Sequence, residues 1–356
     1  MTEYLAPGVY VEEVSFRAKS IEGVSTSTAG FIGAADGPQL LTGITSLTEF
    51  LQQAPSGSSD FLMGAVRGFF ENGGKRCSIA VIAPLAPITD ALEAFAGEPV
   101  SIVCCPDQNV FAGAAHLIVD HCEQRKDRFA ILQSPQPTIP AATHEPPVHS
   151  SYAAYYHPWL VVANGAATLT IPPGGHIAGV YVRTDLEHGV WKSPAGARIL
   201  GATALSQNDS STDINLLVDR GVDVIRSEPG RGVVVWAGRT TSSDSEFKYI
   251  NVRRLLALIE QSIQQGTHWV VFEPDSSAVS EVVLRSIDLF LQNLWKSGAL
   301  VGPTADAAYF VRCDRTTMTA DDIDNGRLVA VVGVAPLRPA EFVVLRFVWQ
   351  RDTPAA

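Results

Sequence analysis

The segment that most constrains this chain lies near its C-terminal end, at residues 342–349. Seven of these eight residues are apolar, and they are rich in the β-branched and aromatic types that favour strands. An uninterrupted run of this kind is typical of a strand buried on both faces. Chain ends are usually frayed and polar, so a strand this apolar is unusual there. It is expected to pair with a sheet. The residues alone leave open whether that sheet belongs to the same chain or to a neighbouring copy.

The other end of the chain poses the same question. Residues 7–14 form a second short β-prone segment, followed by the looser stretch 15–28. Fully extended, residues 1–14 span about 45 Å, at roughly 3.3 Å per residue, which is longer than the radius of an ordinary domain. With 336–339 as a second tether, this arrangement favours β-augmentation, in which each end adds a strand to a neighbour's sheet. Pairing of both strands inside their own domain remains the alternative.

Composition bounds the class of protein. A chain of 356 residues with 46% hydrophobic and 18% charged residues is long enough for two or three globular domains. It contains neither an apolar run that spans a membrane nor a secretory signal, so we expect synthesis in the cytoplasm. The five scattered cysteines indicate reduced thiols. A net charge of −11 without a basic cluster argues against nucleic-acid binding.

The order of elements predicts an α+β fold with an α/β-like part, in which mixed sheets are flanked by helices and extended N- and C-terminal β arms. A strand at 100–104, a helix at 109–124 and a strand at 129–132 indicate a parallel βαβ unit. Apolar stripes predict helices over 252–263 and 279–294, with a strand at 269–272 between them. The predicted domains are an arm and tether at 1–28, an α/β domain at 29–240, a C-terminal domain at 241–335 and an arm strand at 336–356.

Each catalytic or metal-binding motif that we tested fails. Gly73-Gly74-Lys75 lacks the spacing and the hydroxyl of a P-loop, and no Gly-x-Ser-x-Gly elbow is present. Residues 321–326 resemble a calcium loop, but the register places Ile323 at a ligand position and Val332 where the bidentate glutamate belongs. An exposed turn with a helix N-cap is the favoured interpretation. We therefore predict no catalytic, cofactor or metal site, and the competing hypothesis is a soluble α/β hydrolase with an unrecognised triad.

Several motifs in one order resemble the contractile phage tail sheath proteins. Residues 6–13 followed by 30–38 are similar to the start of a sheath protein, and the later matches are 70–74, 189–196, 249–255, 314–318 and 321–326. The chain is short for the family, as are the sheaths of R-type pyocins and extracellular contractile injection systems. The Pro-rich loop 134–150 departs from the pattern, and no role follows for it.

The resemblance implies a non-enzymatic structural subunit that stacks as six-subunit rings around an inner tube and contracts to drive that tube through a target envelope. It favours strand exchange between copies, through the arm residues Val9, Tyr10, Val11, Val14, Phe342, Val343, Val344, Leu345, Phe347, Val348 and Trp349.

The implied partners are further copies, the inner tube protein, baseplate and cap proteins and sheath paralogues, without a cofactor, nucleic acid or membrane insertion. The acidic residues Asp321, Asp322 and Asp324 are candidates for contact with the tube. Assembly in the bacterial cytoplasm, as part of a phage tail or phage-tail-like particle, is implied. A baseplate or end-cap paralogue that forms a single ring is the nearest alternative.

Overall fold

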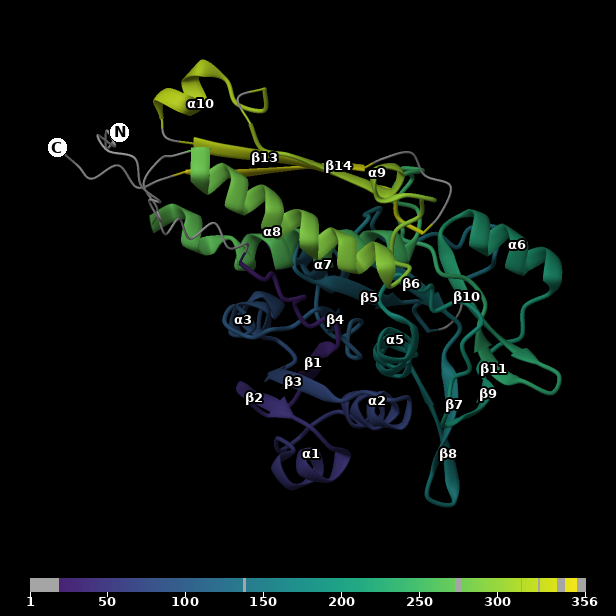
Figure 1. Ribbon diagram of the computed structural model, residues 1–356. Helices are drawn as coiled ribbons and strands as arrows, with labels where there is room; N and C mark the ends of the chain where they lie inside the picture. The colour runs from purple at the N-terminus through teal and green to yellow at the C-terminus, as the bar shows by residue number, and fades with distance from the viewer. Residues whose placement is uncertain are drawn as a thin grey trace, which may run out of the picture.

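The computed structural model describes residues 19–136, 139–272, 277–314, 316–325, 327–337 and 343–350. Its larger part is an eight-stranded sheet covered by helices, and its smaller part carries a three-stranded sheet (Figure 1). Two long helices lie between the large sheet and this smaller sheet in the view of Figure 1. In the described part of the chain, no helix is both long and apolar enough to cross a membrane.

The larger part contains the elements from β1 to β11. They are β1 (Thr28–Ala34), β2 (Gln39–Ile44), α1 (Leu47–Gln53), α2 (Asp60–Glu71), β3 (Arg76–Ile82), α3 (Ile88–Ala94), β4 (Ile102–Cys104), α4 (Ala114–Arg125), β5 (Phe129–Gln133), β6 (Ala153–His157), β7 (Leu160–Asn164), β8 (Ala167–Ile171), α5 (Gly174–His188), β9 (Ala202–Leu205), α6 (Ser211–Asp219), β10 (Val222–Glu228) and β11 (Gly232–Val235).

The smaller part follows in the chain. Its elements are α7 (Ile250–Gly266), η1 (His268–Phe272), α8 (Ser277–Lys296), α9 (Ala305–Ala308), β12 (Tyr309–Arg312), α10 (Ala320–Asp324), β13 (Arg327–Val334) and β14 (Val343–Gln350). The helices predicted over 252–263 and 279–294 are confirmed as α7 and α8.

The large sheet has the strand order β11-β10-β6-β5-β4-β1-β3-β2. Its central strands are parallel, and only the edge pairs β2–β3 and β10–β11 are antiparallel. The parallel βαβ unit predicted from residues 100–132 is therefore confirmed as β4, α4 and β5. The antiparallel hairpin of β7 and β8 forms a separate three-stranded sheet with β9.

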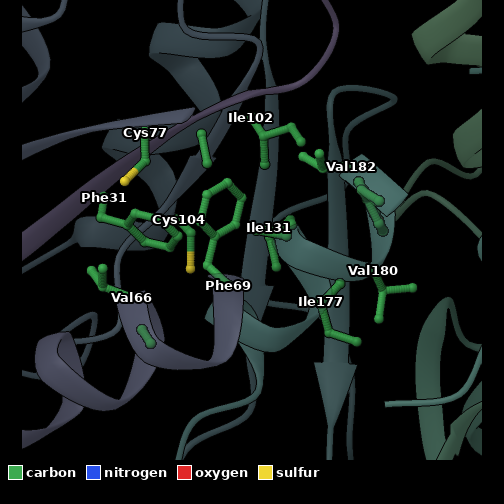
Figure 2. Packing of buried hydrophobic residues seen from close by; sticks show 14 of the residues in the cluster. Phe31, Val66, Phe69, Cys77, Ile102, Cys104, Ile131, Ile177, Val180 and Val182 are labelled. Carbon is green, nitrogen blue, oxygen red and sulfur yellow. The ribbon is translucent and has the colours of Figure 1, made fainter. Parts of the chain in front are cut away.

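The central strands are buried on both faces, so neighbouring residues enter different cores. Phe31 packs with α2 and α5 on one face, while Ile32 packs with α3, α4 and α6 on the other. Figure 2 shows the first of these cores, where Phe69 from α2 and Ile177 from α5 converge with Ile131. Because both faces are covered, these strands are almost wholly apolar rather than alternating.

The strand predicted at 269–272 is wrong, because this segment is the 3₁₀ helix η1. The short apolar run begins two residues after Thr267, whose hydroxyl donates to the Ile263 carbonyl at the end of α7. Val270, 2% exposed, belongs to the hydrophobic core formed around α7 and α8. The apolar residues therefore serve helix packing, and four apolar residues do not distinguish a strand from a buried helical turn.

Helices α2 and α5 approach closely because α5 carries glycines on the contact face. A Cβ atom at Gly175 would lie 2.3 Å from the Ala65 carbonyl oxygen, and one at Gly179 would lie 2.5 Å from that of Phe69. Real Cβ atoms are not found at such distances from backbone, so the α2–α5 contact requires glycine at both positions.

We expect Gly175→Ala to lower the free energy of unfolding by about 1–3 kcal/mol, because the added methyl group forces the two helix backbones apart. Gly97→Ala is the matched control, since a Cβ atom there meets nothing within 4 Å. It should change stability by less than about 0.5 kcal/mol. Urea denaturation of the purified subunit measures both values, and equal effects of the two substitutions would contradict the packing argument.

Candidate assembly surfaces

The C-terminal sheet has the strand order β12-β13-β14, and both neighbours of β13 are antiparallel to it. The β13–β14 ladder is the longer one and runs from the pair Arg327–Gln350 to the pair Val334–Val343. Strand β13 is mostly buried, whereas β14 lies at the edge of the sheet among the described strands. An edge strand presents a row of backbone donors and acceptors to which another strand can be added.

The predicted C-terminal arm residues from Val343 onward lie in β14, with Phe342 outside the described residues. In this single chain they pair with β13 of the same chain. Phe347 is half-buried and packs against the core around α7 and α8, while Arg346 is exposed. The predicted N-terminal arm residues Val9, Tyr10, Val11 and Val14 lie outside the described residues.

Residues 19–28, predicted as part of a loose tether, are held against the body along most of their length. Ile21 is buried beside Gly266, where a Cβ atom would meet the isoleucine side chain at 2.8 Å. The backbone N–H of Lys19 donates to Ser286 of α8, and that of Val24 donates to Ser262 of α7. Residues 19–28 are therefore not a loose tether, because a serine on each helix provides an acceptor for this backbone.

A buried ion pair closes the same junction. Both terminal nitrogens of the Arg254 guanidinium in α7 donate to the Asp185 carboxylate of α5, at 2.8 and 2.6 Å. Thr26 joins them, since its hydroxyl donates to Asp185 and its carbonyl accepts from Arg254. Arg254 also lies over the ring of Tyr181, 4.9 Å from its centroid. Three segments distant in sequence thus meet at one charge pair.

The acidic turn at residues 321–324 has a helix N-cap, as the sequence predicts, and the structure shows this cap to be a capping box at the start of α10. The hydroxyl of Thr319 accepts from the Asp322 backbone N–H, and the Asp322 carboxylate accepts from both the backbone N–H and the hydroxyl of Thr319. These hydrogen bonds, followed by the nearby Arg327, lower the pKa of Asp322. Arg327 also pairs with Asp321, which is 74% exposed. Asp322 is therefore engaged within the subunit, and Asp321 is the more available of the two for a partner.

The site where an open parallel sheet usually binds its ligand is filled by the protein itself. Strand β1 lies between β3 and β4, so the connections diverge there, and ligands of such sheets bind at the carboxyl ends of the strands at this point. Here the buried carboxylate of Asp107 accepts from the backbone N–H of Ala34 at 2.8 Å and from the hydroxyl of Ser59 at 2.6 Å. Burial raises the pKa of Asp107. A carboxylate of the chain thus occupies the position that a phosphate takes in nucleotide-binding sheets.

One cluster contains the residue types of a hydrolase triad. His157 lies 3.2 Å from the Ser134 hydroxyl through Nδ1 and 3.2 Å from the Asp209 carboxylate through Nε2. Ser134 and His157 are each 1% exposed, and His144 packs edge-on against His157 while its own Nε2 lies 3.0 Å from the Tyr155 hydroxyl. A serine without surface cannot reach a substrate, so this cluster is a structural network. It fixes the Pro-rich loop to the end of β6.

No cluster of histidine, cysteine, aspartate and glutamate within the described ranges has the geometry to hold a metal ion. The five cysteines are all buried and unpaired, as expected of reduced thiols.

Two family descriptions match the chain one after the other. The phage tail sheath protein central domain matches residues 86–241, and the phage tail sheath C-terminal domain matches residues 242–350. The chain belongs to the phage tail sheath family. The resemblance drawn from its sequence motifs is therefore confirmed, and the boundary between the two matches lies close to the one predicted at residue 240.

The curated sheath proteins from phages are much longer than this chain. The tail sheath protein of Vibrio phage KVP40 is 29% identical, and that of Enterobacteria phage T4 is 28% identical, each over 182 residues. These matches cover 50% of this sheath protein but only 26% and 27% of the two relatives. The chain thus spans about a quarter of the length of these relatives.

Solved structures match it from end to end. A chain of the contracted helical sheath of the anti-feeding prophage is 33% identical, with a TM-score of 0.77, and the match covers 97% of this chain and 99% of that one. The sheath complex of the PVC extracellular contractile injection system, also contracted, is 28% identical with a TM-score of 0.77 and 98% coverage of both chains. A chain of the anti-feeding prophage baseplate structure is 32% identical with the same TM-score, covering 97% and 99%. The predicted fold class is confirmed.

The buried His144 is one of the groups expected to make the subunit less stable in acid. Burial, and then the neighbouring His157, lower the pKa of His144 to about 4, so the folded state binds its proton later than the unfolded chain does. Stability present above pH 6.5, the ordinary value, is therefore lost as the pH falls toward 4.

Between about pH 7 and pH 4.5 the free energy of unfolding of the natural sequence should decrease. We expect this decrease to be about 2 kcal/mol smaller in His144→Gln. His188→Gln is the control, because His188 is 60% exposed at the end of α5. Urea titrations at both pH values measure the difference. A His144→Gln profile that parallels the natural one would show that this imidazole does not set the acid response.

Proposed function

We propose that this chain is the structural subunit of a contractile sheath, which stacks as six-subunit rings around an inner tube and shortens to drive the tube through a target envelope. The proposal is supported by family membership and by end-to-end similarity to chains of two contracted sheaths. It is non-enzymatic in this proposal, since the triad-like cluster is buried and Asp107 fills the ligand position of the sheet. Assembly in the bacterial cytoplasm belongs to the same proposal.

The observation that carries the proposal is the position of β14. It is an eight-residue strand at the end of the described chain, it forms the edge of its sheet, and it is joined to β13 through residues 335–342. In an isolated chain, β14 can pair only with β13 of the same chain. In an assembly, the same ladder can form with β13 of a neighbouring copy at no cost in backbone hydrogen bonds, which is the basis of strand exchange.

The fixed segments limit how far exchanged arms can move. The backbone is held at Lys19 by Ser286, and near Pro336 by the hydrogen bond from Val301 to the Ala335 carbonyl. This leaves residues 15–18 and 338–342 as the connections to the two arm strands. Fully extended at roughly 3.3 Å per residue, connections of these lengths span at most about 13 and 17 Å, which sets an upper limit on the distance between a body and its arm strands.

Contraction then requires two packings of rigid subunits that differ by a few kcal/mol per copy, with the arms linked in both. The inner tube, the baseplate, a cap and sheath paralogues are the proposed partners. For the tube, the acidic turn with Asp321, Asp322 and Asp324 is the proposed contact, and Asp321 is preferred over Asp322, because the Asp322 carboxylate already accepts from Thr319. A single-ring baseplate paralogue is the second candidate, because the anti-feeding prophage baseplate structure contains a chain that is 32% identical.

We expect the purified protein to form long hollow cylinders in negative-stain electron microscopy, and a variant lacking residues 1–14 to remain folded but build none. Circular dichroism and gel filtration check that the truncated subunit is folded. Single rings from the full chain would favour the baseplate paralogue. Neither rings nor cylinders from the full chain under any assembly condition would remove support for a sheath subunit.

Strand exchange is tested by disulfides between separate copies. Residue 331 of β13 is flanked by Arg312 on β12 and by Arg346 on β14, and both arginines are exposed. In assembled particles that mix Val331→Cys copies with Arg346→Cys copies, we expect disulfide-linked dimers on a non-reducing gel. The natural cysteines are buried and should stay silent.

The matched control mixes Val331→Cys copies with Arg312→Cys copies. Strand β12 precedes the acidic turn and belongs to the same body as β13, so this mixture should yield monomers. If the Arg346 mixture also yields monomers, while a chain carrying both Val331→Cys and Arg346→Cys closes its disulfide internally in the assembled particle, β14 stays on its own subunit.

A further inference from the structure

Four basic side chains line one cleft at the C-terminal end of α5, and a fifth lies beside it. The cleft has a volume of about 450 Å³, and Arg183, Lys192 and Arg198 line it together with His188. Arg231 lies beside it, donating to the Gly196 carbonyl in its wall. Glu187 is the acidic residue of the lining. The sequence shows no basic cluster because these residues are spread over nearly fifty positions.

The arginines of the cleft differ from most other arginines in the described chain, because no carboxylate oxygen lies within 4.0 Å of them. Ten described arginines lie within 4.0 Å of a carboxylate oxygen, namely Arg125, Arg128, Arg220, Arg226, Arg239, Arg253, Arg254, Arg285, Arg327 and Arg346. The six described arginines without such a pair are Arg67, Arg76, Arg183, Arg198, Arg231 and Arg312. Three of these six therefore meet at one place, in a chain whose net charge is −11.

The walls of the cleft are held in place. Arg183 donates to the carbonyls of Asn72 and Arg198, so its guanidinium is fixed without being neutralised. The loop after α5 is joined to β11 by the hydrogen bond from Gly196 to Val235, and to α7 by the one from Asn251 to the Trp191 carbonyl. A site that is already ordered loses little conformational entropy when a partner binds.

The partial negative charge at the C-terminus of α5 accounts for only part of this cluster. That charge is about half an elementary charge and favours a cation in the last turn of the helix. Lys192 and Arg198 lie beyond the helix and are both exposed. The excess positive charge makes this cleft a surface that favours an anionic partner.

We propose that this cleft receives a carboxylate-rich segment of a second copy of this chain. A polypeptide partner fits the lining, since it includes the apolar side chain of Leu200, which is 40% exposed. A second copy fits the charge, because each copy carries 37 acids against 26 bases. Two such copies repel each other unless a basic surface of one meets an acidic surface of the other. The proposal rests on the sheath function, in which copies pack against copies.

The first test is zero-length cross-linking with a carbodiimide, which joins a lysine amine directly to a carboxylate. Isotopically labelled and unlabelled copies are mixed, and linked peptides are identified by mass spectrometry. We expect Lys192 to be joined to an aspartate or glutamate in pairs that carry one label each. Lys192→Arg, which keeps the charge but removes the amine, should abolish this link and preserve association. Links from Lys192 confined to its own chain would overturn the proposal.

The second test measures self-association by analytical ultracentrifugation, whether or not cylinders form. We expect the double variant Lys192→Glu, Arg198→Glu to associate at least roughly tenfold more weakly than the natural sequence at about 150 mM salt. The control is Lys296→Glu with Arg312→Glu, which makes the same change of charge on exposed residues of α8 and β12. Equal weakening in both double variants would reduce the effect to net charge and overturn the proposal.

The outcomes separate this proposal from the sheath function. Cylinders formed equally well by the cleft variant and the natural sequence, with no Lys192 link between copies, would remove the cleft and leave the sheath function standing. Failure of the natural sequence to form cylinders, with the Lys192 link between copies retained, would remove the sheath function and leave the cleft. A single-stranded oligonucleotide that is retarded by the natural sequence and not by the cleft variant would assign the cleft to phosphate and overturn the proposal.

Discussion

The subunit depends on the ion pair between Arg254 and Asp185. Both side chains are almost fully buried, at 6% and 3% exposure, and removal of one partner would leave an uncompensated charge in the interior. The pair joins α7 of the smaller part to α5 of the larger part, and Thr26 adds the segment that leads to the N-terminal arm. Two independently packed cores are thereby connected by a geometry that tolerates little displacement. Under the proposed sheath function this rigidity is required, because a soft hinge between the two parts would absorb the movement passed between neighbours.

The polar groups of the large sheet are satisfied within the chain. Asp107 accepts from Ala34 and Ser59 at the point where related sheets hold a phosphate, and His157 is enclosed by Ser134 and Asp209. Enclosed groups of this kind give a site no access to substrate, but they fix the strand ends and the loops that follow them. The same residue types that carry catalysis elsewhere thus serve here to stiffen a building block, in agreement with the structural role of the family's sheath proteins.

Rigid bodies need specific surfaces in order to assemble, and the chain presents two of different character. The edge of β14 offers directional backbone hydrogen bonds, which give a strong link and a defined register. The basic cleft beside α5 offers charge, which acts at longer range and depends less on exact geometry. An assembly that changes its packing while it stays connected needs a link that persists and a contact that can re-form. The edge of β14 fits the first requirement, and the basic cleft fits the second.

The hydrophobic pattern of the sequence is sufficient to predict the elements that are long or buried on both faces. The stripes of α7 and α8, the βαβ unit around β4 and β5 and the helix N-cap at the acidic turn follow from local chemistry, because each depends on residues a few positions apart. The prediction of a strand at 269–272 is wrong because four consecutive apolar residues show no periodicity that distinguishes a strand from a helical turn. The docking of residues 19–28 was missed because it depends on Ile21 meeting Gly266, some 245 positions away.

The sequence by itself therefore determined the fold class, the terminal strand and the family, through motifs that keep their order along the chain. The tertiary structure alone decided which side chains meet. It paired Arg254 with Asp185, enclosed His157 and gathered Arg183, Lys192 and Arg198 around one cleft. The physical reason is that hydrophobic patterning acts over one turn or one strand, whereas charge pairs and clefts form between segments that only the packed fold brings within a few ångströms.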